Sequence, residues 1–333
     1  MKRLSVAVVQ GGPSSEAEVS RASAKGVAQA LVDAGHQVIR FELDAFLAES
    51  IRQGGYDVVF PAVHGAVGED GSLQGLLEVL EVPYVGSGVL ASALAMDKRQ
   101  ARVAFAAAGL PVARGATAFR GEESAADAAR RARHDVGARV VVKPAVGGSA
   151  IGVARFEAEA PDDEVARAIE AAWELSDAAL VEHFARGREV TCGILDAGEL
   201  VAFPPTEIAS PKDAFYTYEA RYAPGRSLHT CPAPLGDELT ARVQRVAREA
   251  HRALGCRDLS RVDFVVGDDG APDAVTLVTL LEVNTLPGFT ATSLYPEAAA
   301  VSGTPMRDLV DRLVRHAHAR GTSRRSPPRP LPR

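Results

Sequence analysis

The chain contains 333 residues, of which 47% are hydrophobic and 24% are charged, and its formal net charge is −6. This length exceeds one ordinary core and predicts two or three domains of a soluble globular protein, while the acidic balance gives no support to a nucleic-acid partner. No apolar run approaches the roughly 20 residues of a membrane span, and three widely spaced cysteines make neither a disulfide framework nor a zinc site, so we expect a cytoplasmic protein without a membrane partner.

Short apolar strands alternate with helices at the start of the chain. The predicted strands lie at 4–10, 38–41 and 58–61. This alternation is typical of a small parallel α/β domain, which we place at residues 1–97.

Two glycine-containing loops, 11–16 and 64–71, follow strands of this predicted sheet. Ligands gather at the carboxyl ends of parallel strands, and His64 and Glu69 in the second loop are chemically useful side chains. Ordinary turn geometry, which glycine also suits, is the alternative interpretation. After the first loop we expect a helix from about Ser15, with Ser15 and Glu18 forming a capping box.

One segment matches a dinucleotide-binding pattern, G-x-G-x-x-A, at Gly86, Gly88 and Ala91. It lies in the fourth βα unit rather than the first, and no acidic strand end follows at the required distance. These features argue against a nicotinamide enzyme. A P-loop is excluded because the chain contains no G-x-x-x-x-G-K-[ST] sequence.

A different glycine loop occurs at 145–153, between a predicted strand at 139–144 and a second strand. Backbone N–H groups of such a loop can form an anion-binding nest, and Lys143 at the strand end adds a positive charge. This favours a phosphate site. A hairpin with a loose tip is the alternative.

Further elements alternate along the rest of the chain. Helices are predicted at 123–135, 163–175, 236–254 and 305–318, and strands at 179–184 and 189–195. Trp173 is expected to pack in a core. Residues 204–227 form a long irregular stretch, which we interpret as a functional lid, and the basic, proline-rich tail 320–333 is expected to be disordered.

Two more predicted strands, at 261–266 and 275–284, carry polar side chains on one face. Arg261 and Asp263 are two residues apart, as are Glu282 and Asn284, so each pair shares a face of its strand. Neighbouring strands would bring these oxygens together as a site suited to Mg²⁺. An acidic strand end exposed to solvent is the alternative.

Taken in order, the motifs resemble one family from about residue 4 to residue 318. They are Gly11-Gly12-x-Ser14-x-Glu16-x-Glu18-Val19-Ser20, His64-Gly65-x-x-Gly68-Glu69-Asp70-Gly71, Asp97-Lys98, Val142-Lys143-Pro144, Phe215-Tyr216-x-Tyr218-Glu219-Ala220-x-Tyr222, Cys231-Pro232-Ala233, Arg261-Val262-Asp263 and Glu282-Val283-Asn284-Thr285-Leu286-Pro287-Gly288. The chain resembles D-alanine–D-alanine ligases of the ATP-grasp superfamily.

This resemblance implies ATP-dependent joining of two D-alanines, through a D-alanyl phosphate, for peptidoglycan synthesis. It implies an α/β and α+β fold in which an N-terminal parallel α/β domain precedes two antiparallel-sheet domains that sandwich ATP. The implied boundaries are 1–97, 98–185, 186–319 with the lid 204–227, and the tail. A homodimer is usual in the family.

The resemblance also implies site residues for the nucleotide. Lys98 and Lys143 would hold the ATP phosphates with Ser149 nearby, and Arg221 would place its charge on the γ-phosphate. The segment from Glu182 to Phe184 would meet adenine through its backbone, and Glu189 would bind the ribose. Two Mg²⁺ ions, or Mn²⁺ in their place, would bind Asp263, Glu282 and Asn284.

The implied amino-acid site has a second set of residues. Arg261 and the Gly288 N–H would stabilise a tetrahedral oxyanion, and Ser293 with the Leu294 N–H would bind the carboxylate of the second D-alanine. Glu16 would bind the ammonium of the first, and His64 would line the same site. Glu16, Ser149 and Tyr222 would form a hydrogen-bonded set that ties the lid down.

Several positions depart from the family pattern. Residues 146–150 read Val-Gly-Gly-Ser-Ala where Arg-Glu-Gly-Ser-Ser is usual, Arg221 replaces a lysine, and Phe289 replaces a methionine. Two alternatives therefore stay open: an ATP-grasp carboxylate–amine ligase with a different acceptor, and a catalytically silent nucleotide-binding relative. Tyr222 favours an amine acceptor, because relatives that make D-alanyl-D-lactate lack it.

Overall fold

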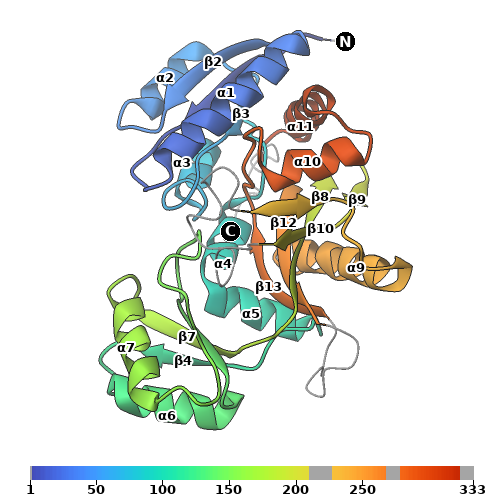
Figure 1. The fold of residues 1–333 in the computed structure, drawn as a ribbon. Helices are drawn as coiled ribbons and strands as arrows, with labels where there is room; N and C mark the ends of the chain where they lie inside the picture. Colours follow the sequence, from blue (N-terminus) through green and yellow to red (C-terminus); the bar gives the residue numbers. More distant parts are fainter. Residues whose placement is uncertain (1, 210–226, 268–277, 323–333) are drawn as a thin grey trace, which may run out of the picture.

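The computed structural model describes residues 2–209, 227–267 and 278–322. The described residues form three β-sheets, and the largest lies between the other two (Figure 1). We number the sheets by their order in the chain, so the middle sheet is the third sheet.

The first sheet is parallel, in the order β2-β1-β3. Its strands are β1 (Ser5–Gln10), β2 (Gln37–Glu42) and β3 (Val58–Pro61), and its helices are α1 (Ala17–Asp33), α2 (Leu47–Gly54) and α3 (Ser72–Val79). Alternate residues of β1 enter two separate cores, one on each face, because helices cover both faces. The predicted parallel α/β arrangement is confirmed.

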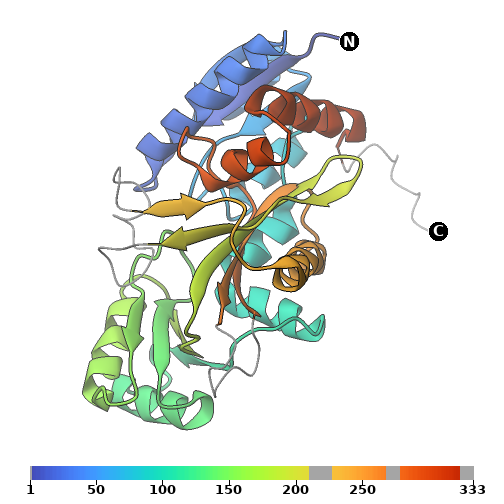
Figure 2. The same ribbon diagram turned by 45° about the vertical axis from the view of Figure 1, so that its right-hand side comes forward.

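The last helix, α11 (Met306–Arg320), returns to this first sheet and packs beside α1 (Figure 2). Its apolar side chains Leu309, Leu313 and Ala317 share a core with Val6 and Val8 of β1. The two ends of the described chain therefore stabilise the same layer.

The predicted capping box is wrong. Helix α1 begins at Ala17, and Glu16 precedes it without a side-chain capping bond. The hydroxyl of Ser14 instead donates to the carbonyl of His64, with the oxygens 2.6 Å apart, and accepts from the Glu16 N–H. This serine joins the two glycine loops of the first sheet.

The second sheet is antiparallel, in the order β4-β7-β5-β6. Its strands are β4 (Gly115–Phe119), β5 (Val140–Pro144), β6 (Ala154–Phe156) and β7 (Ala178–His183). Helices α6 (Ala125–Val136) and α7 (Asp162–Trp173) pack on it through an alanine-rich core. Trp173 packs against that core and donates from Nε1 to the Ala118 carbonyl at 2.9 Å, which confirms its predicted packing role.

The third sheet is also antiparallel, in the order β11-β10-β8-β12-β13, with β9 paired to β8. Its strands are β8 (Arg188–Asp196), β9 (Leu200–Ala202), β10 (Thr206–Ala209), β11 (Leu228–Thr230), β12 (Asp258–Val266) and β13 (Val278–Asn284). One face packs against α9 (Asp237–Ala253), with α4 (Val89–Met96) and α5 (Lys98–Ala107) joining the same core. On the opposite face, Leu195 and Leu259 pack in the core that includes α11, and Glu189, Val265 and Thr279 line a cavity beside the second sheet.

Two sequence expectations need correction in this region. Part of the stretch predicted to be irregular forms strand β10, which pairs with β11 just after that stretch, while residues 210–226, which include Arg221 and Tyr222, lie outside the described residues. Helix α10 (Leu294–Val301) was not predicted. Its start leaves only a partial signal in the sequence, because Ser293 is a common N-cap residue and Pro296 is tolerated in a first helical turn.

No helix in the described ranges is long and apolar enough to cross a membrane.

Candidate active site

The polar ends of β12 and β13 lie side by side. Asp263 is the register partner of Glu282, and Arg261 is the partner of Asn284. Two carboxylates and one amide oxygen therefore project from neighbouring strands. Carboxylate and amide oxygens are the donor types that Mg²⁺ prefers, and the register brings together the side chains that the sequence pattern grouped on this face.

A β-bulge sets the direction of these side chains. Asp263 pairs with Glu282 but the next residue, Phe264, pairs with Leu280, so Leu281 has no register partner. Thr279, Leu281 and Glu282 all line one cavity. In an unbroken strand Leu281 and Glu282 would face opposite sides, so the bulge turns Glu282 towards the cavity that Leu281 also lines.

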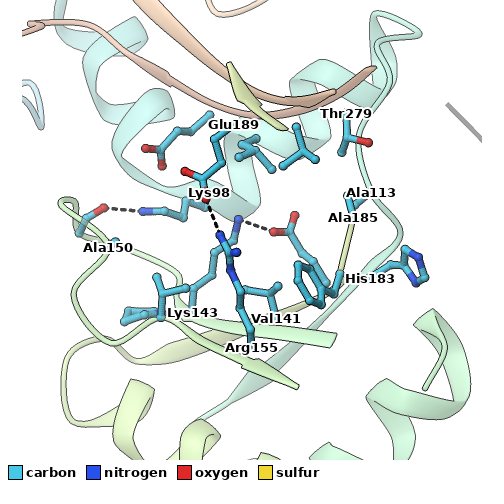
Figure 3. Close-up of a pocket in the computed structure, with 18 of the residues that line it drawn as sticks. Lys98, Ala113, Val141, Lys143, Ala150, Arg155, His183, Ala185, Glu189 and Thr279 are labelled. Carbon is cyan, nitrogen blue, oxygen red and sulfur yellow. Dashed lines mark hydrogen bonds and ion pairs between the residues drawn. The ribbon is translucent and has the colours of Figure 1, made fainter. Parts of the chain in front are cut away.

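This first cavity lies between the second and third sheets (Figure 3). Strands β5, β6 and β7 and the glycine loop form one wall, and β8, β12 and β13 form the other. Apolar residues such as Val141, Phe184 and Leu281 line one part. The charged lining residues include Lys98, Lys143, Arg155, Glu182, Glu189 and Glu282. An apolar slot with charges at its end suits a nucleotide base and its phosphates.

A buried carboxylate holds one of the cavity's lysines. Glu182 of β7 forms ion pairs with Lys143 of β5 and with Arg102 of α5. Burial alone would raise the pKa of Glu182, but the charges of Lys143 and Arg102 outweigh burial and hold that pKa below its ordinary value. Glu182 is therefore ionised and fixes the Lys143 ammonium at the cavity wall.

Lys98 fastens the glycine loop over this cavity. It is the first residue of α5, where Asp97 caps the helix by accepting from the Arg99 N–H at 2.9 Å. Its backbone N–H donates to the Ala145 carbonyl at 2.9 Å, and its ammonium donates to the Gly147 carbonyl. The loop is thus held against a helix N-terminus, a favourable place for phosphate.

Another ion pair crosses the first cavity from β6 to β8. The Arg155 guanidinium lies 2.8 Å from a Glu189 carboxylate oxygen, and Figure 3 shows the two side chains meeting. The same guanidinium lies over the Phe184 ring, 5.3 Å from its centroid. Glu189 is therefore oriented by an arginine from the opposite wall.

The backbone near Phe184 is partly used by the second sheet. The N–H groups of His183 and Phe184 donate to the carbonyls of Arg114 and Arg139. A backbone contact with adenine would therefore use the carbonyl side of this segment or the next residue, Ala185, which also lines the cavity.

A second cavity adjoins the first on the side of the first sheet. Its lining includes Glu16, His64, Ser149, Arg261, Asn284, Gly288, Ser293 and Leu294. Both cavities are lined by Lys98, Gly147, Gly148 and Glu282. The shared boundary thus presents an ammonium, two loop glycines and a carboxylate.

The glycine loop also reaches the first sheet. The Ser149 hydroxyl donates to a Glu16 carboxylate oxygen at 2.5 Å, across 133 positions of sequence. Ser149 and Ala150 have φ of +52° and +57°, a backbone region that costs energy for residues with a side chain. The loop is held in this conformation by contacts to two parts of the chain.

The far end of the second cavity is built at the start of α10. The Ser293 hydroxyl accepts from the Thr290 N–H at 2.9 Å, and Leu294 is the first residue of the helix. A side chain at Gly288 would lie 2.8 Å from that hydroxyl, so close packing explains the glycine. Helix N–H groups beside a hydroxyl suit a carboxylate ligand.

His64 supports this end from behind. Its Nε2 lies 3.1 Å from the Ser23 hydroxyl, which accepts from the Phe289 N–H at 3.2 Å. His64 is buried, and its other ring nitrogen lies 4.0 Å from Glu69. It therefore connects the first sheet to the segment that carries Gly288.

Comparison with known proteins shows which family has this arrangement. The family model for the C-terminus of D-ala D-ala ligase matches residues 104–315, and the model for its N-terminus matches residues 45–87. The chain is 46% identical over 313 residues to a D-alanine–D-alanine ligase of Parvibaculum lavamentivorans, a match that covers 94% of this chain and 97% of that relative. The chain belongs to the D-alanine–D-alanine ligase family.

Solved structures agree with this family. The VanG D-Ala:D-Ser ligase of Enterococcus faecalis has a TM-score of 0.80 at 29% identity, covering 95% of this chain and 100% of that one. The D-alanine–D-alanine ligase of Bacillus anthracis complexed with ATP has a TM-score of 0.77 at 27% identity, covering 94% and 97%. The expected ATP-grasp fold is confirmed, with a parallel sheet followed by two antiparallel sheets.

Several residues of this ligase site escaped sequence analysis. Arg102, Arg155 and Ser23 contact predicted site residues from other elements, and no local pattern marks them. The bulge did leave a signal, because Leu280 and Leu281 are adjacent apolar residues that break the strand's alternation.

Proposed function

We propose that this protein joins two D-alanines to D-alanyl-D-alanine in an ATP-dependent reaction, through a D-alanyl phosphate, for peptidoglycan synthesis. The observation that carries the proposal is the shared boundary of the two cavities at Lys98, the glycine loop and Glu282. A γ-phosphate in the first cavity would meet a carboxylate in the second cavity there.

The first step transfers a phosphoryl group. A carboxylate oxygen of the first D-alanine bonds to the γ-phosphorus as the bond to ADP breaks. Both reactants are anions, so positioning and charge neutralisation govern the rate. Lys98 and Lys143 supply positive charge, while Glu189, held by Arg155, receives the ribose hydroxyls.

Asp263, Glu282 and Asn284 fit Mg²⁺ together with phosphate oxygens. Their donors are all oxygen, and the described residues contain no cluster of three or more His, Cys, Asp or Glu side chains that could hold a metal by itself. Two Mg²⁺ ions, or Mn²⁺, would be bound there and would supply neutralisation of the phosphate charge.

The second step forms the peptide bond. The amine nitrogen of the second D-alanine bonds to the acyl carbon, phosphate leaves, and the nitrogen loses a proton. Arg261 and the Gly288 N–H face the oxyanion of this step, and Ser293 with the Leu294 N–H binds the acceptor's carboxylate. Glu16, anchored by Ser149, binds the ammonium of the first D-alanine.

The proposal includes the contact of Arg221 with the γ-phosphate and the contact of Tyr222 with Glu16 and Ser149. It also includes three domains, at 1–97, 98–185 and 186–319, and the tail 320–333. We also propose a cytoplasmic homodimer without a nucleic-acid or membrane partner. Light scattering during size-exclusion chromatography should give a mass near twice the monomer's 35.0 kDa. A monomeric mass at micromolar concentration would contradict the dimer.

The decisive experiment combines ATP, Mg²⁺ and D-alanine with the purified protein and measures phosphate release and product mass. We expect one phosphate for each D-alanyl-D-alanine. A panel of D-serine, D-lactate and other D-amino acids tests the alternative acceptor. ATP binding without turnover of any substrate would instead identify a silent relative and overturn the proposal.

A further inference from the structure

A threonine on a third strand lies beside the two carboxylates of Asp263 and Glu282. Thr191 of β8 is the register partner of Asp263 of β12, which is in turn the partner of Glu282 of β13. Thr191 is 2% exposed. Its hydroxyl donates to Asp263 Oδ1, with the two oxygens 2.6 Å apart, while its distance to the Val262 carbonyl is 3.3 Å. Its stronger hydrogen bond is therefore to the carboxylate.

Asp263 is held from a second side by an arginine. Arg261 Nε lies 2.9 Å from Oδ1, and Arg261 Nη2 lies 2.8 Å from Oδ2. A cation bound to this carboxylate repels the guanidinium, so the approach of a metal weakens the Arg261 contact. The Thr191 hydroxyl is neutral, so a metal bound to the carboxylate does not repel it as it repels the guanidinium.

We propose that Thr191 is a positioning residue whose hydroxyl keeps the Asp263 carboxylate beside Glu282, and so sets the affinity of the site for a divalent cation. This inference rests on the proposed function, because it takes Asp263 and Glu282 as metal ligands. The hydroxyl preserves the orientation of Asp263 when Arg261 turns to the substrate.

The shape of threonine gives a clean test. Valine has nearly the same volume and the same branched shape, so Thr191→Val removes the hydroxyl and keeps the packing of β8. Thr191→Ser keeps the hydroxyl and removes only the methyl group. Loss of a hydrogen-bond partner behind a metal ligand typically weakens metal binding about 10–100-fold.

The measurement is Mn²⁺ titration followed by water-proton relaxation, in the presence of a nonhydrolysable ATP analogue, because protein-bound Mn²⁺ gives a larger enhancement than Mn²⁺–nucleotide in solution. We expect Thr191→Val to bind Mn²⁺ about 10–100-fold more weakly and Thr191→Ser to bind within about threefold of wild type. In turnover assays the Mg²⁺ concentration for half-maximal rate should rise in the same order.

Two control variants separate the possible failures. If Asp263→Asn and Glu282→Gln weaken Mn²⁺ binding but Thr191→Val does not, the role of Thr191 is refuted and the metal site stands. If neither carboxylate variant alters Mn²⁺ binding, the proposed metal ligands are themselves wrong. Should Thr191→Val lack a cooperative unfolding transition, Thr191→Ala is measured in its place, and unchanged Mn²⁺ binding there refutes the inference equally.

Discussion

Replacing Glu182 by glutamine should destabilise the protein measurably, because this carboxylate lies between two cations. Its side chain is 9% exposed, and those of Lys143 and Arg102 are 10% and 16% exposed. Removing one partner of a buried charge pair costs about 3–5 kcal/mol, since the remaining charges stay desolvated. We expect about 3 kcal/mol, because glutamine keeps a hydrogen-bonding oxygen and both cations retain some exposure.

This free energy corresponds to a shift in melting temperature. The unfolding entropy of a chain of 333 residues is about 0.7 kcal/mol per kelvin, so about 3 kcal/mol lowers Tm by about 4 °C. Differential scanning calorimetry at neutral pH measures the shift. The matched control is Glu174→Gln, whose side chain is 75% exposed beside Arg120 and whose loss should change Tm by less than about 1 °C.

The effect of Glu182→Gln should also depend on pH. The folded protein holds the pKa of Glu182 below its ordinary value, so its stabilising contribution is fully present above the ordinary carboxyl pKa of about 4.3. That contribution is lost as pH falls through the lower folded-state pKa. The Tm difference should therefore stay constant from neutral pH down to about 5 and shrink in stronger acid. If Glu182→Gln had the same Tm as wild type at neutral pH, the assigned ion pairs would be refuted.

Three further variants test the site. Glu282→Gln should abolish turnover while leaving Tm unchanged, and a near-normal rate of phosphate release would show that the metal ligands are misassigned. Ser149→Ala removes the hydrogen bond to Glu16, so the KM for D-alanine should rise about tenfold and by more than the KM for ATP; an equal rise in both would point to a general loop defect. Arg155→Gln frees Glu189, and the preference for ATP over dATP should fall about tenfold, whereas an unchanged ratio would contradict ribose binding by Glu189.

The sequence predicted those parts of the molecule that depend on local periodicity. Side chains alternate along a strand, so residues two positions apart share a face. This rule predicted that Asp263 shares a face with Arg261 and that Glu282 shares a face with Asn284. The alternation of strands and helices likewise predicted the first sheet. In both cases the information lies within ten or so neighbouring residues.

What the sequence could not supply depends on contacts between distant segments. Arg102 and Glu182 are 80 positions apart, and Thr191 and Asp263 are 72 apart, so only the folded sheets bring them together. The bulge at Leu281 shifts the strand by one residue, which reverses the facing of every side chain after it. Paired apolar residues indicate such a shift only once the neighbouring strand is known.

The return of α11 to the first sheet has a consequence during synthesis on the ribosome. Residues from Leu309 to Ala317 complete a core begun by Val6 and Val8, and Arg315 donates to the backbone carbonyl of Lys2 at 2.8 Å. One face of the first sheet therefore stays partly uncovered until α11 has emerged. A nascent chain therefore cannot complete the layer that carries Glu16 before α11 has emerged.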